Sequence, residues 1–141
     1  MAKVVSVKAE VGHNERVDAQ VGHHVIVMDQ PEDSGGEDLG PSPVEVFVAS
    51  VAACTVHYLR VACRRHDVDA SRLTVDAVAI PSTDAPARLG TIQITCHLPG
   101  HVPDELKKRL ISTAESCYLA RTILRSPDIE LQLQCGSPTN G

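Results

Sequence analysis

Aromatic side chains are nearly absent from this sequence, which has one Phe, two Tyr and no Trp in 141 residues. A core of this size must therefore be built from Val, Ile, Leu and Ala, and the stacking platforms that bind single-stranded nucleic acid are missing. Positively charged residues are also outnumbered, since the sequence has 13 Lys and Arg and 18 Asp and Glu. Phosphate binding needs a concentrated basic surface, so we expect no nucleic-acid partner.

The chain has no N-terminal apolar block typical of a secretory signal and no uncharged span of 18 residues. We therefore expect a cytoplasmic protein without a membrane partner. The five cysteines are an odd number at irregular spacing, in a chain long enough to form a core without disulfides. Reduced thiols are the expected state.

The period of the apolar residues changes along the chain and predicts the order of the elements. Loose alternation in residues 1–29 predicts an antiparallel meander, and a Gly/Pro-rich polar loop follows over 30–41. The remaining predicted elements are a central helix over 42–66, a β-hairpin over 72–98, a second helical segment over 103–124, a last strand over 129–135 and a tail over 136–141. The order βββ-α-ββ-α-β predicts a single α+β domain, residues 1–141, with antiparallel sheets.

The central helix is the longest apolar stretch. Ser42 can cap its first turn, Pro43 suits the first helical position, and Glu45 completes a capping box. From Val44 onward nearly every residue is apolar or small, which predicts a helix packed on several sides. Cys54 lies near the middle of this helix, beyond the reach of the helix dipole.

Two cysteines, Cys54 and Cys117, lie on apolar faces of the two predicted helices and can meet if those helices pack together. Such a pair could run a dithiol cycle, in which one thiolate attacks a peroxide, becomes a sulfenic acid and condenses with the second thiol. The alternative is that free cysteines in apolar segments are small hydrophobic residues. We favour this second interpretation for Cys96 and for Cys135, which occupy inward positions of predicted strands.

Metal binding is the competing chemistry for the same helix. The pairs Cys54-x-x-His57 and Cys63-x-x-His66 each share one helical face, but they start nine residues apart, about 180° around the helix. They cannot close one four-ligand site within a chain. The neighbours His23-His24 and Cys96-His97 point to opposite faces of strands. We therefore expect no metal site and no cofactor.

Two stretches resemble the OsmC/Ohr superfamily of osmotically inducible and organic-hydroperoxide-resistance proteins. The first runs from Asp29-Gln-Pro31 through Gly35-Gly-Glu-Asp-Leu-Gly-Pro-Ser-Pro-Val-Glu45 to Ala52-Ala-Cys54-Thr55, and the second is Glu115-Ser-Cys117-Tyr-Leu-Ala-Arg-Thr-Ile-Leu124. With the element order, the resemblance covers nearly the whole chain and is closest to the redox-protein-like branch. It implies an intertwined homodimer whose sheets enclose two long central helices, with two active sites at the interface.

The resemblance also implies a thiol-dependent peroxidase that reduces organic hydroperoxides or hydrogen peroxide in oxidative-stress protection, with a thiol reductant of unknown identity. It carries over Cys54 as the peroxidatic thiol and Cys117 as the resolving thiol. Glu45 lies one residue after the glutamate of the hydroperoxidase branch, and Arg16 is the candidate for the activating arginine, since no other Arg precedes Arg60. These departures motivate an alternative, a non-catalytic module that binds a hydrophobic small molecule at the dimer interface.

Overall fold

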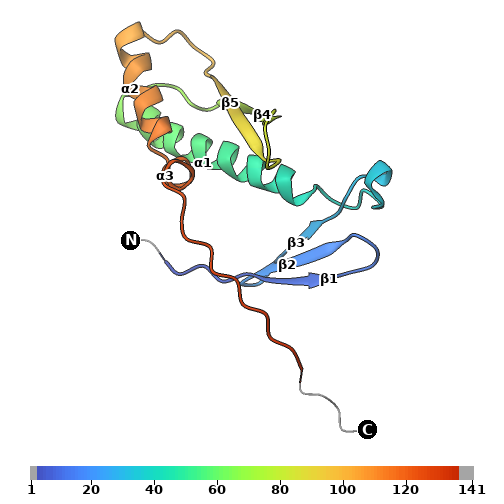
Figure 1. Cartoon of the computed structure of the whole chain (residues 1–141). Helices are drawn as coiled ribbons and strands as arrows, with labels where there is room; N and C mark the ends of the chain where they lie inside the picture. The colour runs from blue at the N-terminus through green and yellow to red at the C-terminus, as the bar shows by residue number, and fades with distance from the viewer. Residues whose placement is uncertain (1–2, 137–141) are drawn as a thin grey trace, which may run out of the picture.

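A computed structural model describes residues 3–136 as two antiparallel sheets and three α-helices (Figure 1). The elements are β1 (Lys8–Val11), β2 (Val17–Val21), β3 (His24–Met28), a 3-10 turn η1 (Glu32–Ser34), α1 (Pro43–Arg65), β4 (Thr74–Pro81), β5 (Leu89–His97), α2 (Asp104–Glu115) and α3 (Tyr118–Leu124). One sheet has the order β1-β2-β3 and the other is the hairpin β4-β5. The predicted α+β class with a long central helix is confirmed, and the observed order is βββ-α-ββ-α-α.

The central helix starts as predicted. The Glu45 carboxylate accepts hydrogen bonds from the Ser42 N–H at 2.7 Å and the Ser42 hydroxyl at 2.9 Å, and the Glu45 N–H donates back to the Ser42 hydroxyl. Among the described residues, α1 is the helix whose length and apolar content would suit a membrane span. Its inner face instead packs against β4 and α2, as the core helix of the fold.

In the single chain, α1 is covered on one side only. Its buried residues are Val51, Thr55, Leu59, Ala62 and Cys63. The opposite, outward face of the helix carries the exposed residues Ala53, His57 and Arg60. Val44 and Phe47 lie on the same side of the helix as Val51 but at its start, and they are 55% and 44% exposed. The prediction of packing on several sides is therefore wrong for one chain, because no element of the described residues covers the outward face.

The core lies where α1 meets α2 and the loop after β5. Leu59, Ala62 and Cys63 of α1 form a buried cluster with Val102 and Leu110. Partly buried Leu73, Leu98 and Leu106 pack around this cluster. Cys63 is fully enclosed there, on the opposite side of α1 from Cys54.

The second helical segment is broken into α2 and α3. The Ser116 hydroxyl donates to the Thr113 carbonyl at 2.8 Å, and the Ser116 and Cys117 N–H groups close the last turn of α2. Cys117 then adopts extended backbone angles, φ −61° and ψ 150°. A serine that bonds to the backbone competes with helix continuation, which explains why the helix ends here and restarts at Tyr118.

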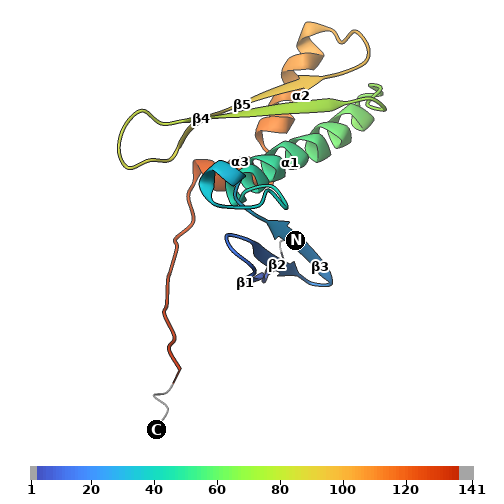
Figure 2. The same cartoon turned by 90° about the vertical axis from the view of Figure 1, so that its right-hand side faces the viewer.

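The predicted last strand over 129–135 is wrong for the single chain. Residues 126–136 form no strand and run away from α3, and the two views show that they do not lie along either sheet (Figure 1, Figure 2). Ile129, Leu131 and Leu133 are 86–89% exposed. Alternation favours a strand only where a neighbouring strand completes the ladder, and no described strand pairs with this segment. The tail predicted for 136–141 falls, beyond Gly136, outside the described residues.

The N-terminal sheet stands apart from the helices and from the β4-β5 hairpin (Figure 2). Its register aligns Ala9 with Ala19 and Ile26, and Val11 with Val17 and Met28. Because side chains alternate across a sheet, these residues share one apolar face. Of this face only Ala19 is fully buried, so most of it has no cover within the described chain.

A buried carboxylate joins this sheet to the loop that leads into α1. Asp29, 2% exposed, accepts hydrogen bonds from the N–H groups of Gln30 at 2.8 Å, Glu37 at 3.1 Å and Leu39 at 3.2 Å. A Cβ on Gly36 would lie 1.9 Å from the Gln30 carbonyl oxygen, so only glycine allows this close approach. The Asp29-to-Glu45 motif is thus a folded loop that sets the position of α1.

The pKa of Asp29 is lowered on balance. Burial by itself raises the pKa of this carboxyl, but the three N–H donors and the nearby Arg16 charge outweigh that effect. The carboxylate therefore stabilises the fold above its unfolded pKa of about 3.9, and this contribution is lost as the pH falls through the lower folded pKa.

Asp29→Asn is expected to lower the thermal midpoint by several degrees at pH 7, since the amide carries no charge and its NH₂ group can face N–H donors. Thermal unfolding from pH 7 to pH 2 should show the gap from wild type shrinking below pH 4. Asp33→Asn, on the exposed 3-10 turn, is the matched control and should leave the midpoint unchanged. An Asp29→Asn gap of equal size at pH 2.5 and pH 7 would contradict the charge-based account.

Candidate active site

The structure brings Cys54 and Cys117 together. Cys54 is half-buried in the middle of α1, and Cys117 is fully buried at the bend between α2 and α3. Helices α1 and α3 pack against each other, and the two thiols are close enough for Cys117 to raise the pKa of Cys54. The predicted meeting of the two cysteines is therefore observed, while the chemical role of each stays a prediction.

The pKa of the Cys54 thiol is raised. Burial is the main cause, and the neighbouring Cys117 thiol raises this pKa further, whereas the N–H groups of Leu119 and Tyr118 act in the opposite direction. Within the described chain, no Lys, Arg or His contributes to this balance. The thiolate needed for nucleophilic attack is therefore a minor species at neutral pH in the isolated chain.

Cys117 has a structural task as well as a position beside Cys54. It is the N-cap residue of α3, and its Sγ accepts a hydrogen bond from the Ala120 N–H at 3.3 Å. The sequence pattern did not predict this role, because cysteine is not among the residues preferred at N-caps. The one sequence feature that could have indicated a new helix here is Ser116, whose side chain bonds to the backbone of α2.

Arg16 does not lie at the thiol pair of its own chain. Its guanidinium binds the Asp18 carboxylate, with Nε to Oδ1 at 2.8 Å and Nη2 to Oδ2 at 3.1 Å. This ion pair raises the pKa of Arg16 and lowers that of Asp18. Arg16 is absent from the groups that act on Cys54.

Glu45 is also separated from the thiols within the chain. It lies nine residues before Cys54 on the same helix, about 13 Å along the helix axis. The hydrogen bonds from Ser42 lower the pKa of its carboxyl. In the structure, Glu45 forms the capping box of α1 with Ser42.

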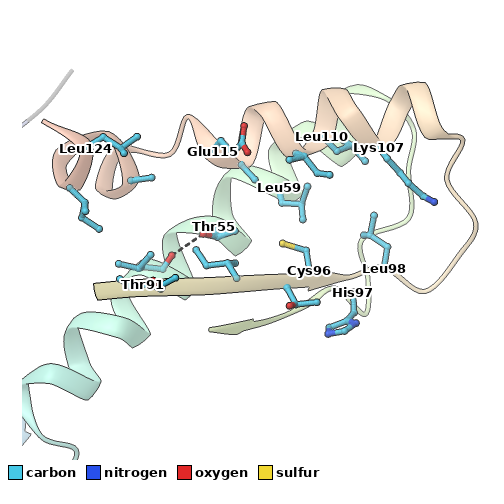
Figure 3. Close-up of a pocket in the computed structure, with 18 of the residues that line it drawn as sticks. Thr55, Leu59, Thr91, Cys96, His97, Leu98, Lys107, Leu110, Glu115 and Leu124 are labelled. Carbon is cyan, nitrogen blue, oxygen red and sulfur yellow. Dashed lines mark hydrogen bonds between the residues drawn. The ribbon is translucent and has the colours of Figure 1, made fainter. Parts of the chain in front are cut away.

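An apolar groove of about 1190 Å³ lies between α1, β5, α2 and α3 (Figure 3). Thr55 and Leu59 line it from α1, and Leu110 lines it from α2. The Thr55 hydroxyl donates a hydrogen bond to the Val51 carbonyl at 3.0 Å, so it does not present a free donor to the groove. Few polar groups are present along the lining, among them Lys107 and Glu115.

Cys96 opens onto this groove from β5 and is exposed (Figure 3). The prediction that it fills a core is therefore wrong for the single chain, because the inner face of β5 is not fully covered. Cys135 is exposed too, in the extended segment after α3. Its predicted inward position depended on a strand that does not form.

Among residues 3–136, no group of three or more His, Cys, Asp and Glu side chains has the geometry of a metal site. The chemistry-bearing cluster of this part of the chain is the pair of thiols, with two backbone N–H groups beside Cys54.

Comparison with known families gives one match that spans most of the chain. The profile of the family described as "OsmC-like protein" matches residues 35–132. This range includes the second half of the loop after Asp29, helices α1 and α3, and both cysteines. No curated protein matches the sequence.

Several solved structures share the fold. A protein of Psychrobacter arcticus described as part of an osmotic-stress and detoxification response is 21% identical, with a TM-score of 0.75 over 86% of this chain and 90% of that one. An OsmC-like protein of Mycoplasma pneumoniae is 17% identical, with a TM-score of 0.74 over 89% and 91%. An organic hydroperoxide resistance protein of Legionella pneumophila is 21% identical, with a TM-score of 0.67 over 87% and 90%.

Proposed function

The chain belongs to the OsmC family, and from that premise we propose that it is a thiol-dependent peroxidase that reduces organic hydroperoxides or hydrogen peroxide. The observation that carries the proposal is the contact between Cys54 and Cys117 across α1 and α3. The Legionella relative, named for organic hydroperoxide resistance, supports a peroxide-related stress function for the same fold.

Cys54 is the thiol that meets the peroxide, because it is half-exposed whereas Cys117 is fully buried. The Cys54 thiolate attacks one peroxide oxygen, the S–O bond forms, the O–O bond breaks and the alkoxide leaves as an alcohol after taking a proton. Cys117 then attacks the resulting sulfenic acid, and the hydroxyl leaves as water with the proton of that thiol. An external thiol reductant returns two electrons and two protons.

We propose further that the working unit is a homodimer. Three apolar surfaces lack cover in the described chain: the apolar face of the β1-β2-β3 sheet, the start of α1 with Val44 and Phe47, and the segment 129–135. Exposed apolar surface on this scale is typical of a protein interface. Since Arg16 and Glu45 lie away from the Cys54 of their own chain, any part they take in activation comes from the second copy.

One equivalent of cumene hydroperoxide is expected to produce a Cys54–Cys117 disulfide. Peptide mapping should find Cys63, Cys96 and Cys135 still reduced. Cys63 is enclosed in the core, where burial raises its pKa, and no other thiol is among the groups that act on Cys96. Cys96→Ser is the matched control, because it removes the groove thiol and should leave the disulfide yield unchanged. A wild-type protein that loses no thiols within minutes would contradict the peroxidase proposal.

The groove supports a second candidate function, a module that binds a hydrophobic small molecule while the thiols serve as packing. Its volume of about 1190 Å³ and its apolar lining fit such a ligand. Native mass spectrometry of freshly purified protein separates the two candidates. A co-purified ligand together with unreactive thiols favours binding, and an empty groove together with rapid thiol loss favours the enzyme.

A further inference from the structure

Helix α3 is held by Cys117 at its first turn and by few other contacts. The Cys117 Sγ accepts the Ala120 N–H, and the Cys117 carbonyl accepts the Arg121 N–H at 3.0 Å. The helix has seven residues, and Tyr118, Ile123 and Leu124 are 59%, 41% and 80% exposed. A helix this short is marginal without such support, because nucleation is costly.

Disulfide formation changes this support directly. The two thiols are not bonded in the structure, so they must approach to form an S–S bond of about 2.05 Å. Cys54 sits in the middle of a 23-residue helix whose inner face is anchored in the core, whereas Cys117 sits at the start of the short α3. The movement therefore falls on Cys117, away from the Ala120 N–H.

Condensation of Cys117 with the Cys54 sulfenic acid forms the S–S bond, breaks the S–O bond and releases water. A Cys117 sulfur that has moved to Cys54 no longer accepts the Ala120 N–H. The first turn of α3 then loses its side-chain cap.

We propose that α3 is a redox-sensitive lid, closed while Cys117 is a thiol and opened when Cys117 is joined to Cys54. The inference rests on the proposed thiol cycle and adds the regulation of access to it. Cys117 is inaccessible in the closed state, so a reductant that attacks the disulfide at the Cys117 sulfur needs the lid to move. The open lid gives that reductant access only after the peroxide has been consumed.

Hydrogen–deuterium exchange read by mass spectrometry tests the lid on the full chain, before and after one equivalent of cumene hydroperoxide. Amides of residues 120–125 are expected to exchange at least about tenfold faster in the disulfide form than in the thiol form. Amides of α2, residues 104–115, are the internal control and should not change. Peptide mapping of the same samples measures the fraction of disulfide.

Two variants at one position separate the cap from the disulfide. Cys117→Ser keeps an N-cap acceptor but cannot form the disulfide, so α3 should stay protected with and without peroxide. Cys117→Ala lacks both, so α3 should exchange fast under both conditions. Equal exchange rates of the α3 amides in the two variants would overturn the inference. An unchanged exchange rate of these amides in wild type, with the disulfide fully formed, would also overturn it. Absence of the disulfide itself would overturn the thiol cycle, and the lid with it.

Discussion

Cys54→Ser is expected to slow hydroperoxide consumption by about a hundredfold or more, because a serine hydroxyl is not a peroxide nucleophile under conditions where a thiolate is. The initial rate of cumene hydroperoxide loss, measured with dithiothreitol as reductant, gives the comparison. Cys96→Ser is the control, since this thiol lies exposed in the groove but has no partner thiol beside it within the described chain. Its rate should equal that of wild type.

The division of roles between the two thiols gives a second readout of the same experiment. Cys117→Ser should still consume one equivalent of peroxide, and dimedone should then trap a sulfenic acid on Cys54, because the thiol that normally removes this intermediate is gone. Wild type should give little trapped product. A Cys54→Ser protein that consumes peroxide as fast as wild type would mean that the peroxidatic assignment is wrong.

The isolated chain holds no group that activates Cys54 among its described residues. Burial and the Cys117 thiol raise the pKa of Cys54, and two backbone N–H groups oppose them without reversing the shift. Arg16 is tied to Asp18, and Glu45 is tied to Ser42. A cation that lowers this pKa must therefore approach from outside the described chain, which is one physical reason for placing the site at an interface between two copies.

The fold was predictable where local chemistry decides the structure. The capping box of Ser42 and Glu45 marked the start of α1, and the alternation in residues 91–98 marked β5. Apolar periodicity predicted that Cys54 and Cys117 could meet if the helices pack together, although Cys117 lies at the bend between α2 and α3 and not on a helical face. These features depend on hydrogen-bond partners and periodicity that lie within a few residues.

The remaining features depend on contacts that periodicity does not identify. Alternation in 129–135 shows that one face is to be covered, but it does not show which strand, or which chain, covers it. The same holds for Cys96 and for the outward face of α1, which were predicted as buried and are exposed in one chain. The break after Glu115 depends on a single serine side chain that bonds to the backbone. Glu45 and Arg16 were chosen for a resemblance, and their structural tasks became visible only from their hydrogen bonds.

Wild-type protein is expected to behave as a dimer in light scattering, with about twice the 15.1 kDa chain mass, and Leu131→Asp with Leu133→Asp is expected to yield monomers. Both leucines are more than 80% exposed in the single chain and lie on the apolar face of the segment 129–135. Burying one leucine contributes roughly 1.5–3 kcal/mol, so the four leucines of a dimer contribute roughly 6–12 kcal/mol. A loss of this size would dissociate the dimer at micromolar concentration.

The matched control is Gln132→Asp with Gln134→Asp, which adds the same charge to the polar face of the same segment. Since successive side chains of a strand point to opposite faces, this variant should remain dimeric. Dissociation of both variants would indicate that charge repulsion, rather than burial of the apolar face, separates the copies. If the leucine variant stays a dimer with unchanged peroxide consumption, the segment 129–135 does not contribute to the interface. The start of α1 and the apolar face of the β1-β2-β3 sheet must then account for it alone.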